Sequence, residues 1–193
     1  MRRVILTLFI IVGGCFSASA ESLLNCFERS LAALGDYRVA FTVTMGDMVT
    51  EGNYAVSGND FYITLYGAEY YVADGVKYEI NSERKEIVID SAQSLGGDLL
   101  SNPAQAFSIL ARDFEQREVS IDSRRAVRLS ERNGGVGDML VVADKNGTLP
   151  QMIVYIYGEE RMTIVLDSIE SLAAGIPRFD RSKYADFEVI DMR

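Results

Sequence analysis

The alternation that decides the fold begins at residue 37, where the chain reads YRVAFTVTM up to residue 45. Every second residue of this stretch is apolar or aromatic, and the residues between are Arg, Ala and Thr. A period of two places the apolar side chains on one face of a β-strand. We therefore predict a half-buried strand here, with Phe41 and Val43 pointing into the core.

Short strands joined by tight turns continue this pattern as far as residue 90. Gly46-Asp47, Gly58-Asn59-Asp60 and Asp74-Gly75 are sequences typical of turns. The turns leave no room for the crossover that a parallel pair needs, so we predict an antiparallel meander. Its further strands are predicted at 50–57, 61–66, 69–73, 76–81 and 86–90.

Two regions have helical spacing instead. Apolar residues recur at intervals of three and four in 22–34, and Gly35 lies where a C-cap glycine belongs. Residues 91–102 predict a loose or short helix, and Pro103 can begin a second helix that runs to about Asp113. We expect the first helix to cover the sheet.

Strands resume after the second helical region. The alternation predicts them at 118–122, 125–131, 139–143, 151–157 and 161–168, with an edge strand at 187–190. Ten or eleven antiparallel strands with helices at the start and in the middle predict a mainly β fold with helices, a strongly curved sheet on which the helices lie.

The N-terminus has the features of a secretory signal peptide. Arg2 and Arg3 precede an apolar run at 4–12, and Ala18-Ser19-Ala20 fits the small-x-small rule for cleavage. The run is too short to cross a bilayer as a helix. We predict a signal peptide at 1–20 and a single mature domain at 21–193, located in the periplasm.

The two cysteines leave one alternative open. Val12-Gly13-Gly14-Cys15 resembles a bacterial lipobox, in which Cys15 would be lipidated and would tether the protein to a membrane. With cleavage after Ala20, Cys26 is the only mature cysteine, so no intramolecular disulfide can form. Its apolar neighbours predict a buried structural thiol rather than a nucleophile.

Charge and composition exclude several functional classes. Removing Arg2 and Arg3 leaves 17 basic and 28 acidic residues, a formal charge of −11, which argues against nucleic-acid binding. There is no histidine, no Walker A motif and no CxxC pair, so the usual general bases, zinc ligands and nucleophile pairs are missing. We expect no enzyme, metal or cofactor, although the acids leave a carboxylate hydrolase as an alternative.

Ten tyrosines and nine phenylalanines, seven of them between residues 54 and 78, supply aromatic surface instead. A curved sheet facing a loose helix pair can leave an apolar cavity. Strand 61–66 would place Phe61, Ile63 and Leu65 on one face of the sheet. An ordinary sheet core explains any one of these residues equally well.

The order of four short motifs resembles the LolA family, periplasmic carriers of lipoproteins. The motifs are LAALGDYRVAFTVT at 31–44, EGNY at 51–54, VADGVKYEI at 72–80 and DKNGTLP at 144–150. The resemblance extends over nearly the whole mature chain. It implies an unclosed, strongly curved antiparallel β-barrel of about eleven strands, with a helical lid over an apolar concave face.

The sequence departs from the family pattern in two places. Ser57-Gly58-Asn59 replaces the basic segment whose arginine latches the lid in family members, so no latch residue can be assigned. The family's tryptophans are absent as well, and Tyr54, Thr64 and Tyr78 lie near their positions.

The resemblance implies a carrier that binds lipoprotein acyl chains and passes them from an inner-membrane release complex to an outer-membrane acceptor. We expect a monomer that binds acylated lipoproteins or other lipid and no nucleic acid. The alternatives are a lipid-anchored receptor or module of the same fold and a structural envelope protein. We predict that the cavity is lined by Phe41, Val43, Tyr54, Phe61, Ile63, Leu65, Tyr78 and Ile80, with Leu99, Phe107 and Leu110 on the lid.

Overall fold

The computed structural model describes residues 21–95, 99–132 and 137–193. The predicted signal peptide with Cys15, and most of the glycine-rich loop at 133–136, lie outside the described residues. Within these ranges no helix is long and apolar enough to span a membrane.

Two α-helices, two 3-10 turns and twelve strands make up the described chain. In order they are α1 (Leu23–Ala32), β1 (Tyr37–Met45), β2 (Met48–Ser57), β3 (Asp60–Leu65), β4 (Ala68–Ala73), β5 (Val76–Asn81), β6 (Glu86–Ser91), η1 (Ala92–Ser94), α2 (Ala106–Asp113), β7 (Phe114–Ile121), β8 (Arg124–Glu131), β9 (Gly137–Ala143), β10 (Pro150–Tyr157), β11 (Glu160–Ser171), η2 (Arg181–Tyr184) and β12 (Glu188–Asp191).

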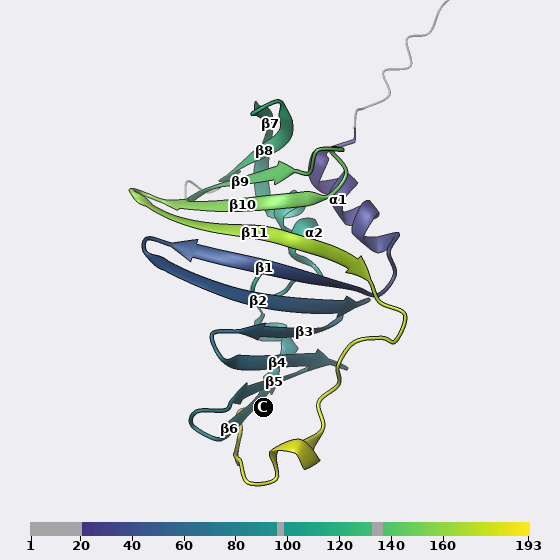
Figure 1. Cartoon of the computed structure of the whole chain (residues 1–193), viewed down its shortest axis with the longest axis vertical. Coiled ribbons are helices and arrows are strands. Elements are labelled where there is room, and N and C mark those ends of the chain that lie inside the picture. The colour runs from purple at the N-terminus through teal and green to yellow at the C-terminus, as the bar shows by residue number, and fades with distance from the viewer. Residues whose placement is uncertain (1–20, 96–98, 133–136) are drawn as a thin grey trace, which may run out of the picture.

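All twelve strands belong to one sheet, in the order β12-β6-β5-β4-β3-β2-β1-β11-β10-β9-β8-β7. Strands β1–β6 form one antiparallel meander and β7–β11 a second, and antiparallel pairing of β1 with β11 joins them at the centre. Figure 1 shows the strands stacked from β7 to β6, with α2 behind the central strands. The sheet does not close on itself, so the predicted unclosed, mainly antiparallel β fold with helices is confirmed.

Local irregularities bend this sheet. Ala40 pairs with Ser168 and Phe41 with Leu166, so Asp167 of β11 is an extra residue between the two pairs. A similar shift occurs in β10, where Pro150 pairs with Ala143 and Met152 with Val142. Bulges of this kind kink a strand and increase its twist. The first of them lies in the β1–β11 pair that joins the two meanders.

The larger hydrophobic core lies between the helices and one face of the sheet, here called the concave face. Ser22 caps the N-terminus of helix α1, and its side chain accepts a hydrogen bond from the Asn25 N–H at 3.3 Å. Its apolar stripe buries Leu24, Phe27 and Leu31 against the sheet. The predicted role of this helix, covering the sheet, is confirmed.

The opposite, convex face of β3–β6 has a smaller core, which the C-terminal segment covers. Figure 1 shows this segment running from β11 down to the edge strand β6. The ring of Phe179 stacks on Tyr78 with centroids 4.1 Å apart, and Tyr184 packs with Tyr71, Ile80 and Ile87. The Glu69 carboxylate accepts hydrogen bonds from the hydroxyls of Tyr62, Tyr71 and Tyr184, at 2.7, 2.9 and 3.1 Å.

Several predicted boundaries need correction. Strand β7 begins at Phe114 rather than at residue 118, directly after α2, and Tyr66 is a turn residue with a φ of 52° rather than the end of a strand. The predicted edge strand is present as β12, but it pairs in parallel with β6 and gives the sheet a twelfth strand. The predicted helix at 91–102 falls partly on residues 96–98, which lie outside the described residues, and the helical structure described in this range is the 3-10 turn η1.

Gly52 of β2 provides a test of how tightly the concave core is packed. A Cβ atom at this position would lie 2.5 and 2.7 Å from two ring atoms of Phe41, and 2.8 Å from the carbonyl oxygen of Thr64. We predict that Gly52→Ala lowers the free energy of unfolding by about 1–3 kcal/mol, as overpacking of cores usually does. Urea unfolding followed by circular dichroism measures this change.

The matched control is Gly137→Ala in β9. A Cβ atom there would lie 3.3 Å from the ring of Tyr157, which is 56% exposed and can move aside. Equal losses for the two variants would show that strand propensity, rather than the Phe41 contact, sets the cost.

Candidate functional site

The concave face carries a continuous apolar core that both meanders and both helices share. Nine of the eleven predicted cavity and lid residues belong to this core, and each is at most 8% exposed. They are Phe41, Val43, Tyr54, Phe61, Ile63, Leu65, Leu99, Phe107 and Leu110. The structure thus brings these nine side chains together, and their role in binding a ligand stays a prediction.

Tyr78 and Ile80 lie on the convex face instead, in the core covered by the C-terminal segment. Residues directly opposite each other in an antiparallel pair share a face. In β4 and β5, Val72 pairs with Lys77 and Tyr71 with Tyr78. Val72 packs in the concave core, so Lys77 shares its face, and the prediction for β5 was wrong by one residue.

Helices α1 and α2 pack against each other as well as against the sheet. The rings of Phe27 and Phe107 meet edge to face with centroids 5.8 Å apart. This geometry is favourable for two aromatic rings. Ala106, Phe107 and Leu110 form the buried side of α2, which has only eight residues. The cover over the concave face is therefore small, and one aromatic contact links its two helices.

Three crevices border the chain segment that leads into α2. The first, of about 370 Å³, lies between the end of α1, the start of β1 and residues 103–108. A second, of about 230 Å³, is lined by Phe61, Ile63, Tyr70, Val72, Lys77, Leu95, Leu100 and Ser101. A third, of about 370 Å³, includes Asn59, Asp74 and Gln105. Binding pockets for small ligands have volumes of about 300–1,000 Å³, so the first and third are within that range.

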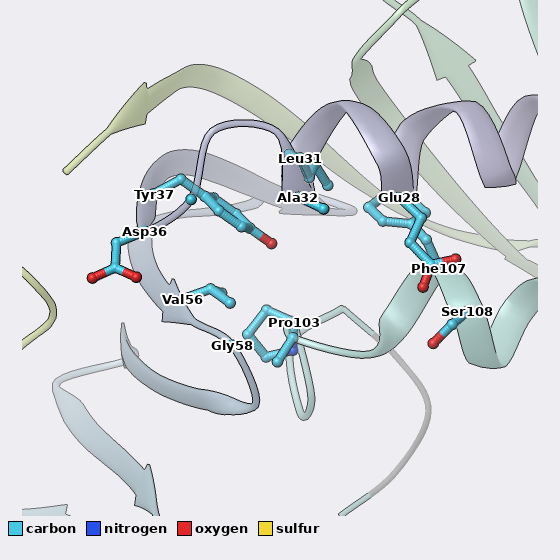
Figure 2. Close-up of a pocket in the computed structure, with 12 residues that line it drawn as sticks. Glu28, Leu31, Ala32, Asp36, Tyr37, Val56, Gly58, Pro103, Phe107 and Ser108 are labelled. Carbon is cyan, nitrogen blue, oxygen red and sulfur yellow. The ribbon is translucent and has the colours of Figure 1, made fainter.

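Figure 2 shows the first crevice with the residues that line it. The Tyr37 ring projects from β1 with its hydroxyl toward the middle of the space, between Ala32 of α1 and Pro103. Leu31, Val56 and Phe107 supply apolar wall, and Glu28 and Asp36 supply carboxylates. The crevice thus combines an apolar lining with a few polar groups, as ligand sites usually do.

Three buried tyrosines, Tyr37, Tyr54 and Tyr155, bring hydroxyl groups into the otherwise apolar core. Tyr37 and Tyr54 are 5% and 1% exposed, and their rings meet edge to face at 6.4 Å. Burial raises the pKa of Tyr37 to about 12, and burial followed by the neighbouring Tyr37 raises the pKa of Tyr54 well above its usual value. Both phenols therefore stay protonated and neutral near pH 7.

The described part of the concave face offers little for catalysis. Asn102 is the one buried polar residue found in the described ranges, and no group of three potential metal ligands occurs there.

Sequence reasoning missed several residues of the crevices. The alternation indicates only a strand position for Tyr37, and nothing in the sequence marks its hydroxyl as unpaired. Tyr70 and Lys77 line the second crevice because the register of β4 and β5 places them on the concave face. Leu95 and Leu100 could have been found, because they flank the glycine pair in the predicted lid.

Comparison with known proteins supports the fold. No protein-family model matches the sequence. None of the curated proteins matches it either. Among solved structures, an uncharacterized conserved protein from Thermus thermophilus is similar, with 11% identity and a TM-score of 0.56, over 88% of this chain and 96% of that chain.

Two further structures match less well. A LolA superfamily protein, NE2245 from Nitrosomonas europaea, is 9% identical over 84% of this chain and 95% of its own, with a TM-score of 0.40. LprF from Mycobacterium bovis is 12% identical over 81% of this chain and 94% of its own, with a TM-score of 0.45. At these identities the likeness concerns the fold alone. The predicted architecture, an unclosed curved sheet with helices on one face, is confirmed by the sheet order, and the Thermus thermophilus structure shares this fold.

Proposed function

We propose that the protein is an exported periplasmic carrier that binds the acyl chains of lipoproteins or other lipids on its concave face. One observation carries the proposal. The concave face is apolar across both meanders, and its cover is a pair of small helices bordered by crevices. An ordinary core has no need of an open border, whereas a carrier must admit and release a chain.

The affinity of such a carrier depends on the exchange of α2 side chains for the acyl chain on the concave face. Each acyl CH₂ group taken out of water contributes about 0.8 kcal/mol. In the structure, the buried side chains of α2 occupy the concave face that a ligand would use. An acyl chain that enters must displace these side chains. The free-energy cost of displacing them offsets part of the free energy gained by burying the acyl chain. Binding is then weaker than burial alone would give, which makes release to an acceptor feasible.

Other parts of the proposal rest on the sequence resemblance. We propose a mature protein that begins at Glu21, acts without enzymatic activity, receives cargo from an inner-membrane release complex and delivers it to an outer-membrane acceptor. The apolar character of the described concave core supports a binding role over a carboxylate hydrolase. A lipid-anchored form would differ at Cys15.

A native mass spectrum of the protein, purified without detergent from cell-envelope fractions, tests this proposal. We expect a species that begins at Glu21 and carries lipid or an acylated polypeptide. A chain that begins with lipidated Cys15 would show that the protein is a membrane-anchored module and not a free carrier. A Glu21 form that stays empty even after incubation with acyl lipids would contradict acyl binding.

Loosening the cover should make a chain easier to bind. Phe107→Ala removes the ring that packs on Phe27, and we predict a loss of about 3–5 kcal/mol in unfolding free energy, as for other buried phenylalanines. Because less has to be displaced, the affinity for a fluorescent acyl probe should rise. Chemical unfolding and probe titration measure the two effects.

The milder Phe107→Leu keeps the core apolar and serves if the alanine variant fails to fold. Tyr66→Ala, at a site 59% exposed, is the matched aromatic control and should change neither quantity. A folded variant with lower stability and unchanged or weaker acyl binding would show that displacement of the Phe107 ring does not limit binding.

A further inference from the structure

The hydroxyl of Tyr37 has an unusual position. The residue is 5% exposed, yet its hydroxyl faces the first crevice, as Figure 2 shows. No other residue in the described ranges forms a hydrogen bond with it. The hydroxyl therefore opens onto the crevice, where it can donate a hydrogen bond to water or to a ligand.

We propose that this crevice holds the carbonyl end of the bound acyl chain, with the Tyr37 hydroxyl donating a hydrogen bond to an ester or amide carbonyl oxygen. This inference rests on the proposed function and specifies its ligand class. The chain beyond the carbonyl runs inward over Val56 and Phe107, which belong both to the crevice wall and to the concave core.

Charge at the crevice selects against an anionic head. Glu28 and Asp36 both line the crevice, and neither carboxylate forms an ion pair with another residue in the described ranges. Glu28 is exposed and Asp36 is half-buried, so both would repel a fatty-acid carboxylate bound at Tyr37 through water. The ligand class is therefore a neutral acyl ester or amide.

The Tyr37 phenol suits this task over a wide pH range. Burial raises its pKa to about 12, so it is a neutral donor throughout the range in which the protein would work. Binding of a neutral ester should accordingly show no dependence on pH between about 6 and 9.

Calorimetric titration with three probes of equal chain length tests the assignment. The probes are a monoacylglycerol, the matching fatty acid and the matching fatty alcohol, each below its micelle concentration. We expect the native protein to bind the monoacylglycerol most tightly. Tyr37→Phe should weaken monoacylglycerol binding about three- to tenfold, the loss of one neutral hydrogen bond, and leave alcohol binding unchanged.

Two further variants complete the design. Tyr66→Phe alters an exposed tyrosine and should bind all three probes as the native protein does. The double variant Glu28→Gln with Asp36→Asn should bind the fatty acid more tightly while its affinity for the monoacylglycerol stays the same.

Several results would overturn the assignment. If folded Tyr37→Phe bound the monoacylglycerol as tightly as the native protein does, the proposed hydrogen bond from Tyr37 would be ruled out. Preferred binding of the fatty acid, abolished by Lys77→Met and indifferent to Tyr37→Phe, would place the head in the second crevice. In both cases acyl binding itself survives. If no probe binds the native protein, the proposed function fails together with the inference.

Discussion

The burial of one apolar sheet face is the constraint that governs this structure. The concave face presents side chains from strands on both sides of the sheet centre, among them Phe41, Ile63 and Leu129, and all are nearly inaccessible to water. Exposed apolar surface costs about 25 cal/mol per Å², so a face of this extent must be covered by something. Helices α1 and α2 are that cover. The proposed carrier role depends on this cover, which is small enough for an acyl chain to displace.

The pairing of β1 with β11 sets where the cover meets the sheet. It joins two meanders that are far apart in sequence, and it places Tyr37, opposite Ser171, directly after the turn that follows α1. The first crevice opens at this junction. On the other side of the sheet, the C-terminal segment buries the convex face of β3–β6 and adds β12 to the edge at β6. The two faces of one sheet thus have different covers, a helical one over the concave face and an extended segment over the convex face.

The fold class and much of the concave face could be predicted from the sequence, because alternation within a single strand assigns side chains to a face. In β1 and β3, strict alternation with a single apolar set assigns Phe41 and Ile63 to the buried face without knowledge of any distant segment. In β5, Val76, Tyr78 and Ile80 also alternate, but alternation does not tell which face of the sheet they join. Both faces are buried there because Phe179, a hundred residues later, stacks on Tyr78. The parallel docking of β12 and the crevice at Tyr37 likewise depend on contacts between distant segments, which local patterns cannot reveal.

Whether an acyl chain binds beneath the helices can be measured by photo-crosslinking with an acyl lipid that carries a diazirine near the end of its chain. After irradiation and proteolysis, peptide mass spectrometry locates the modified residues. We predict labels on the concave core, at residues such as Val56, Phe107 and Leu110, that an excess of unlabelled lipid removes. Competable labels confined to the convex face around Tyr78 and Phe179 would contradict acyl binding on the concave face, because the chain would then bind beneath the C-terminal segment and not beneath the helices.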